Sequence, residues 1–150
     1  MRKDVKTGTV AAAYQVLNAA HYGKLGDAEK IAVWKLLRAM KPVAVEFTDA
    51  VHDAEDKLKP VEDYDDRMLL AREFETLQGK DARMTHEEYL AFVMMHKEYR
   101  KTVGEAIKEL NDKEVSLEVV PIGEETFCRL MSSNDWTLEQ ATILGEIITE

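Results

Sequence analysis

The residues of this chain that could do chemistry are its four histidines and their acidic neighbours. His52 and Asp53 are adjacent, which is the arrangement that holds a metal ion in helical phosphohydrolases, and His21 and Asp112 would have to supply the remaining ligands. This pattern makes a small metal-dependent phosphohydrolase the enzymatic alternative. Both His52 and Asp53, however, fall on outward positions of an amphipathic helix, whereas metal ligands need a closed and oriented pocket.

Other metal-binding patterns are incomplete. A di-iron bundle needs Glu-x-x-His pairs, and no histidine here has a glutamate three positions before it. In "HEEYL" Leu90 stands where a zincin helix needs its second histidine. Asp49 and His52 share a helix face, but the apolar pattern turns that face towards water. We therefore predict no metal, no cofactor and no catalytic residues.

The remaining reactive or bulky residues are expected to be structural. His96 lies between Phe92 and Tyr99 on an apolar helix face, so we expect it to be packed and hydrogen-bonded. Cys128 has no histidine near it in sequence and is expected to be a small buried side chain. Core positions are also expected for Trp34, Trp136, Met94 and Met95.

Composition bounds the class of protein. A chain of 150 residues with 45% hydrophobic residues is typical of one folded domain, here residues 1–150. No apolar run approaches the ~20 residues that span a bilayer, and the single cysteine fits a reducing compartment, so a cytoplasmic location is expected. The net charge is −9, yet residues 1–45 hold eight Lys/Arg against three Asp/Glu, a sum of +5, which leaves −14 for residues 46–150. This asymmetry favours a charged partner surface or a head-to-tail contact.

Apolar residues recur at helical spacing over most of the chain. We place N-caps at Thr7 and Asp27, and capping boxes at Thr85 with Glu88 and at Thr137 with Gln140. The predicted helices cover about 8–22, 27–58, 66–78, 86–111, 124–131 and 138–148.

The two long helices carry matching apolar runs in steps of three and four, from Leu37 to Leu58 and from Tyr89 to Leu110. A repeat averaging 3.5 residues predicts an antiparallel hairpin of coiled-coil type. Large side chains then face small ones when Val51 lies opposite Phe92. Pro42 lies inside the first run and points away from its apolar side, which predicts a kinked but continuous helix with a hinge as the alternative.

The segment "KEVSLEVVPIG" alternates Val115, Leu117 and Val119 with polar residues, which predicts a half-buried strand. Its expected partner is the N-terminal segment near residues 3–6, and its apolar side should pack on Tyr14 and Leu17. The predicted fold is therefore mainly α: a long antiparallel helical hairpin with short flanking helices and a small two-stranded β ribbon joining the chain ends.

The chain resembles a family of small phage and prophage proteins of unknown function. The resemblance lies in "VKTGTVAAAYQVLNAA", "WKLLRAMKPVAVEFTDAVHDAEDKL", "EVSLEVVPI" and "ILGEIITE", and it does not extend to residues 60–88. It implies a short strand and helix, a long helix with an internal proline and a strand ending in proline. It also implies an accessory or morphogenesis protein, and it assigns no active-site residues.

These observations predict a non-enzymatic protein that acts by binding another protein, either a phage structural protein or a second copy of itself. The candidate partner surface consists of Val115, Leu117, Val119, Lys35, Arg38 and Lys41. The open edges of the ribbon are one candidate for association, because unpaired edges accept strands. Nucleic-acid binding through Arg2, Lys3, Lys6 and the three cations of residues 35–41 is a further alternative, disfavoured by the acidic remainder of the chain. No membrane partner is expected.

Overall fold

A two-stranded ribbon joins the two end segments of the chain, as predicted. In the computed structural model, which describes residues 1–150, strand β1 (Arg2–Lys6) pairs antiparallel with β2 (Glu114–Glu118). The register sets Lys3 opposite Leu117 and Val5 opposite Val115, so the residues that point inward on both strands meet. The alternation in "EVSLE" therefore identified both the strand and its partner.

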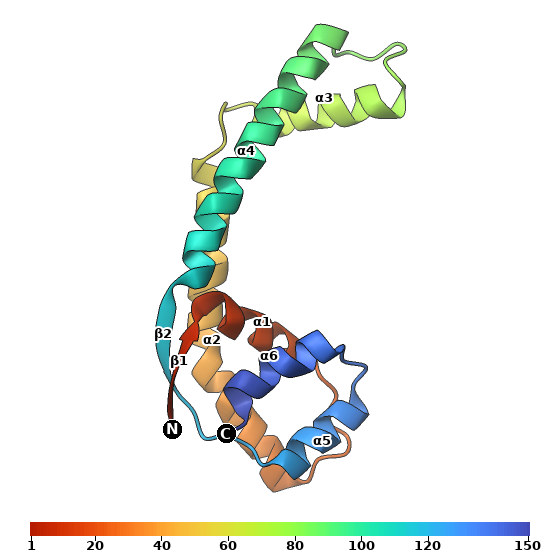
Figure 1. Ribbon diagram of the computed structural model, residues 1–150. Helices are drawn as coiled ribbons and strands as arrows, with labels where there is room; N and C mark the ends of the chain where they lie inside the picture. Colours follow the sequence, from red (N-terminus) through yellow and green to blue (C-terminus); the bar gives the residue numbers. More distant parts are fainter. The chain divides into compact units, whose positions relative to one another are not determined.

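The rest of the fold is mainly α-helical, and the two long helices run antiparallel as a hairpin (Figure 1), whereas their pairing as a coiled coil stays a prediction. Every predicted helix is present, and no end differs from its predicted position by more than four residues. The helices are α1 (Thr7–Asn18), α2 (Asp27–Lys57), α3 (Tyr64–Thr76), α4 (His86–Asp112), α5 (Glu124–Ser133) and α6 (Leu138–Ile148).

Local capping explains the starts of α2, α4 and α6. Both predicted capping boxes form: Glu88 N donates to Thr85 Oγ1 at 3.1 Å, and Gln140 N donates to Thr137 Oγ1 at the same distance. The two other N-caps were assigned one residue too late. Thr7 is the first residue of α1 and its hydroxyl donates to Lys113 O, whereas α2 is capped at Gly26, whose N–H donates to Glu29 Oε1.

The chain divides into two compact units. Unit 1 comprises residues 1–50 and 109–150, and unit 2 comprises residues 51–108. Unit 1 thus holds the ribbon, α1, most of α2, α5 and α6. Unit 2 holds the last turns of α2, all of α3 and most of α4.

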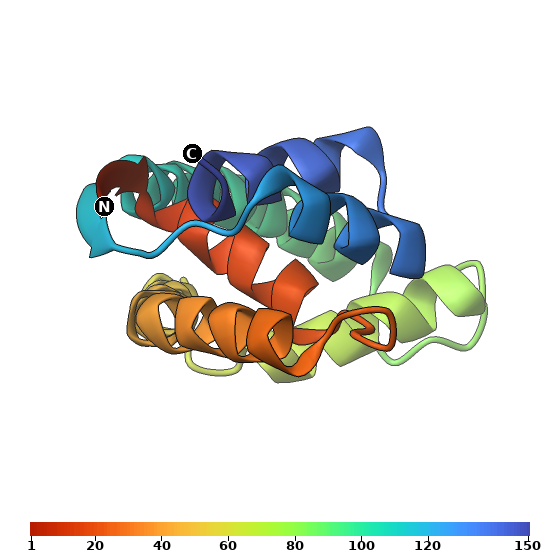
Figure 2. The same cartoon turned by 90° about the horizontal axis from the view of Figure 1, so that it is seen from below.

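Unit 1 has a continuous apolar core. In Figure 2, α1 lies between α2 and α6, and its buried residues Val10, Ala13 and Leu17 are in the centre of the core. The ribbon contributes Leu117 and Val119, which join the same cluster as Tyr14 and Leu17, as predicted. Other members are Leu25, Val33, Leu36, Met40, Ile122, Leu130, Leu144, Ile147 and Ile148.

Unit 2 is held together mainly by aromatic rings. Tyr64, at the start of α3, packs on Phe92 and Tyr99 of α4 with ring centroids 5.6 and 4.8 Å apart. At the other end of α3, Phe74 stacks on Tyr89 at 4.3 Å. The buried centre consists of Tyr64, Ala71, Met84 and Phe92. Helix α3 therefore covers the first half of α4.

The predicted register of the hairpin is wrong. It sets Val51 opposite Phe92 and therefore Glu55 opposite Glu88, but Tyr99 Oη donates to Glu55 O at 2.6 Å. Tyr99 lies eleven residues beyond Glu88, or about 16 Å along a helix that rises about 1.5 Å per residue. The volume argument failed because Phe92 and Tyr89 pack on Tyr64 and Phe74 of α3 and not on small residues of α2.

Helix α2 runs unbroken through Pro42, which is exposed. The prediction of a continuous helix with the proline facing water is confirmed, and the kink at Pro42 stays a prediction. Its role as a hinge stays a prediction.

Candidate functional site

Helix α2 carries apolar side chains on two opposite sides. In unit 1 its inner side buries Val33, Leu36, Met40 and Ala44. Its outer side, half a helical turn away, exposes apolar and basic residues at the same three- and four-residue spacing. We call this side the α2 outer face, and it consists of Ile31, Trp34, Lys35, Arg38, Lys41 and Val45.

The apolar part of the α2 outer face is large for an exposed helix surface. Ile31 is 54% exposed, Trp34 53% and Val45 45%. The guanidinium carbon of Arg38 lies 4.8 Å from the centre of the Trp34 ring, which is a cation–π contact. The prediction of Trp34 as a core residue is wrong, because Val33 and Leu36 already occupy the inner side of the helix.

The three predicted cations of the partner surface all lie on this face. Lys35, Arg38 and Lys41 are exposed, and none of them forms an ion pair within the chain. The face therefore combines uncompensated positive charge with an exposed aromatic ring. Ile31 and Val45 were missed from the sequence, although an apolar repeat on both sides of one helix could have revealed them.

The apolar residues of the predicted partner surface, unlike its three cations, are mostly buried. Leu117 and Val119 are only 4% and 3% exposed and Val115 is half-buried, so their side chains belong to the core of unit 1. The outward positions of the strands carry mostly charges, with Arg2 opposite Glu118 and Lys6 opposite Glu114. Short strands with charged side chains are poor templates for edge pairing. What the ribbon offers a partner is therefore limited to backbone groups on its edges.

A hydrogen-bond network centred on Glu29 fixes the start of α2 against α5. Glu29 Oε2 accepts bonds from Arg129 Nη2 at 2.6 Å and Thr126 Oγ1 at 2.6 Å, and Glu29 Oε1 accepts one from Gly26 N at 3.0 Å. These donors, Arg129 first, lower the pKa of the Glu29 carboxyl to about 2. The network holds the N-terminal half of the α2 outer face in place, and nothing in the local sequence pattern indicated it.

The proposed phosphohydrolase residues are not gathered into a site. His52 and Asp53 are exposed on α2, and His21 is exposed in unit 1. No group of three or more His, Cys, Asp or Glu side chains is arranged so that it could hold a metal ion. The enzymatic alternative requires these side chains to converge in a pocket, and the structure shows no such convergence.

The other residues singled out from the sequence have mixed outcomes. His96 is packed as predicted: its ring lies against Phe92 with centroids 5.7 Å apart, and its Nδ1 is hydrogen-bonded to the Tyr64 hydroxyl. Trp136 packs against the core of unit 1. The core predictions for Cys128 and Met94 are wrong, because both are exposed. Each lies on the solvent side of an amphipathic helix whose inner side is filled by other residues.

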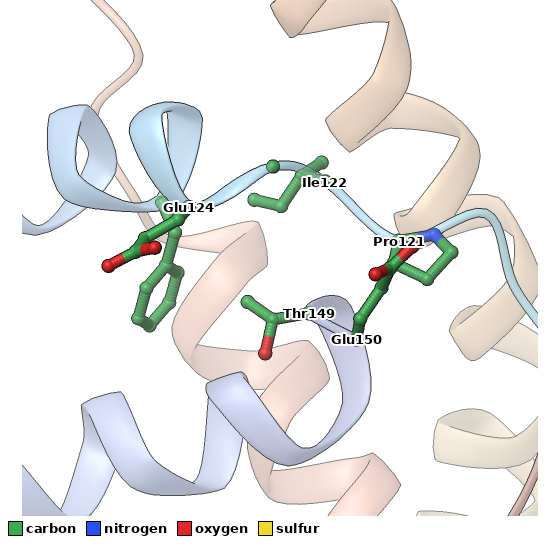
Figure 3. A pocket seen from close by; sticks show the side chains of 7 residues that line it. Pro121, Ile122, Glu124, Thr149 and Glu150 are labelled. Atoms are coloured by element: carbon green, nitrogen blue, oxygen red, sulfur yellow. The ribbon is translucent and has the colours of Figure 1, made fainter.

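The concave regions outside the α2 outer face include a pocket in unit 1 and two grooves between α3 and α4 in unit 2. In unit 1 the pocket lies between the segment that precedes α5 and the end of α6, with Glu124 and Glu150 on opposite sides (Figure 3). It is lined by these two carboxylates and by the Thr149 hydroxyl, which donates to Gly145 O at 2.5 Å, and it contains no histidine or cysteine. In unit 2 one groove between α3 and α4 has an apolar floor that includes Ala71 and Phe92, with Arg72 and Arg100 among its lining residues. His96 also lines this groove, and its Nδ1 is hydrogen-bonded to the Tyr64 hydroxyl.

Comparison with protein-family models, with curated proteins and with solved structures gives no match to this chain. None of its helices combines the length and the apolar character needed to cross a membrane. Inferences about function therefore depend on the surface described above.

Proposed function

We propose that this protein is a non-enzymatic accessory protein that binds another protein through the α2 outer face. The observation that carries the proposal is the second apolar side of α2, on which Trp34 is half exposed beside Arg38. Binding within a phage assembly pathway is the setting that the sequence resemblance implies, and that part of the proposal rests on the resemblance alone.

The composition of the face is that of a protein-binding surface. Tryptophan and arginine are the residues most enriched among those that dominate binding energy, and exposed apolar side chains around them exclude water from the contact. Ile31 and Val45 lie on either side of Trp34 along the helix. A partner helix laid along α2 would cover all three apolar residues at once.

Charge indicates the chemistry of the partner. Lys35, Arg38 and Lys41 have no acid three or four residues away on α2, and none of them forms an ion pair within the chain. A complementary surface would be apolar in its middle and acidic along its margins. The proposed partner is therefore an acidic amphipathic segment of another protein.

Nucleic acid is the second candidate, because an exposed tryptophan among cations can stack on a base while the cations contact phosphates. Two of the other predicted contacts are occupied within the chain: Lys3 Nζ donates to Glu146 O at 2.9 Å, and Lys6 pairs with Asp112 at 3.3 Å. The basic surface is thus confined largely to α2, which favours a protein partner.

The experiment uses the two tryptophans of the chain. In a Trp136→Phe background, Trp34 is the only indole, so its fluorescence reports on the α2 outer face. The probes are a synthetic acidic amphipathic helix, a basic peptide of the same apolar pattern and a short DNA duplex. We expect the acidic peptide to shift the Trp34 emission and to bind more weakly as salt is raised.

A matched pair of variants tests the location of the site. Arg38→Glu should weaken binding of the fluorescently labelled acidic peptide by about tenfold or more, as expected for a central residue of an interface. Lys108→Glu changes charge equally at an exposed site on α4 in unit 2 and should leave the affinity unchanged. Equal losses for both variants, preference for DNA, or no response to any probe would each contradict the proposal.

A further inference from the structure

Helix α4 presents a second unpartnered surface, in unit 2. Its inner side packs through Tyr89, Phe92 and Tyr99 on α3 and the end of α2. The opposite side exposes a row of residues at alternating steps of four and three along the helix, of which Leu90 is 49% exposed and Met94 75%. We call this row the α4 outer stripe, and it consists of Glu87, Leu90, Met94, Lys97 and Lys101.

The charges of the α4 outer stripe are ordered along the helix. An acid lies at its start, two apolar residues in its middle and two lysines at its far end. None of Glu87, Lys97 and Lys101 forms an ion pair or a side-chain hydrogen bond within the chain, whereas Arg67, Glu73 and Arg83 of the same unit are all paired. The α4 outer stripe therefore carries unpaired charges of both signs, separated by two apolar residues.

This order is complementary to itself when a second copy is turned end to end. An antiparallel pairing centred on Met94 sets Glu87 of one copy opposite Lys101 of the other, and Met94 against Met94. Leu90 then meets Lys97, whose aliphatic stem can cover it while the ammonium group stays in water. A two-fold axis repeats each of the Glu87 and Leu90 contacts, and the step of three and four is that of a coiled-coil seam.

The alternatives fit the same residues less well. A parallel pairing would set Glu87 against Glu87 and both lysines against lysines, which is repulsive. An acidic partner would satisfy the lysines and repel Glu87, and a basic partner would do the reverse. Only a partner that carries both signs in reversed order satisfies the whole stripe, and a second copy of this chain is such a partner.

We infer that the α4 outer stripe is the seam of a symmetric antiparallel contact between two copies of this protein. The contact is centred on Met94, whose flexible and polarisable side chain adapts to a like neighbour. It uses unit 2 and does not depend on the α2 outer face or on the function proposed for it.

Sedimentation equilibrium of the full chain tests the inference. The fitted mass should rise from one chain of 17.1 kDa towards two as the concentration increases. Met94→Glu sets two carboxylates against each other on the two-fold axis, so it should weaken association at least about tenfold. The control is Leu138→Glu, the same kind of change at a leucine of α6 in unit 1 that is 88% exposed, and it should associate like the wild type. Circular dichroism should show the same helix content and melting temperature for both variants, since both sites are exposed.

Charge reversal tests the direction of the contact. Glu87→Lys should weaken association because it meets Lys101, and Lys101→Glu in the same chain should restore it, because the reversed pair is again complementary. A wild-type protein that keeps the mass of one chain at every concentration overturns the inference. So does a Met94→Glu variant that associates like the wild type, or a double charge reversal that fails to recover association.

Discussion

Unit 1 and unit 2 are both built from amphipathic helices, yet their cores contain very different numbers of buried side chains. The core of unit 1 contains fourteen buried residues and that of unit 2 contains four, and all nine of the largest fully enclosed side chains belong to unit 1. Since apolar stabilisation grows with the area removed from water, most of the packing energy of the chain lies in unit 1.

Unit 2 compensates with specific contacts. Its helices meet through stacked and tilted rings, and two tyrosine hydroxyls, those of Tyr99 and Tyr89, bond to Glu55 O at 2.6 Å and Glu75 Oε1 at 2.8 Å. Both units leave apolar side chains exposed on their helices, such as Trp34 on α2 in unit 1 and Met94 on α4 in unit 2. The difference between the units therefore lies in how their helices are held together: unit 1 relies on the burial of many apolar side chains, and unit 2 on a few ring and hydroxyl contacts.

The largest effect is expected from a cavity in unit 1. Leu17→Ala removes a completely buried side chain from the centre of the core, and it should lower the free energy of unfolding by about 2–5 kcal/mol. The matched change in unit 2 is Leu70→Ala, at a leucine that is only partly buried, and it should cost clearly less. Urea denaturation of both variants makes the comparison. Equal losses would show that the two cores contribute alike.

A smaller effect is expected from a single hydroxyl in unit 2. Tyr64→Phe keeps the ring among Phe92 and Tyr99 but removes its hydrogen bond to His96 Nδ1. The expected loss is about 0.5–1.5 kcal/mol in the free energy of unfolding. Tyr14→Phe in unit 1 is the control, because the Tyr14 hydroxyl makes no hydrogen bond within the chain. The account of unit 2 is wrong if both variants have the stability of the wild type.

The smallest effect concerns acid stability in unit 1. The pKa of the Glu29 carboxyl is lowered from 4.5 to about 2 by its bonds to Arg129, Thr126 and Gly26. Because the folded state holds this carboxylate ionised, its contribution is complete above pH 4.5 and is lost as the pH falls towards 2. Glu29→Gln should therefore have a lower melting temperature than the wild type at neutral pH, and the gap should close near pH 2. A gap that is the same at both pH values would contradict the assigned network.

Sequence periodicity located the elements well because each helix and strand follows from residues close together in the chain. The ribbon pairing, both capping boxes and the burial of Leu117 and Val119 were all predicted from local patterns. The hairpin register failed because it depended on α3, whose aromatic residues compete with α2 for the same side of α4.

The candidate site was predicted only in part for a similar reason. Lys35, Arg38 and Lys41 stood out by charge, and their exposure agrees with that reading. Trp34 was placed in the core because its size favours burial in general, although the phase of the helix turns it outward. Glu29 and its side-chain donors Thr126 and Arg129 are about one hundred residues apart in sequence, so no local pattern could pair them.

Native-state hydrogen exchange tests the contrast between the two units most directly, because it gives an opening free energy for individual amides. Amides in the middle of α1 and α6, which lie in the larger core, should exchange only through the least frequent openings. Amides of α3 and of residues 86–100 in α4 should open with a lower free energy, since only four buried residues close that part of the molecule. Opening free energies in α3 equal to or above those in α1 would show that unit 2 is as cohesive as unit 1 and would contradict the account.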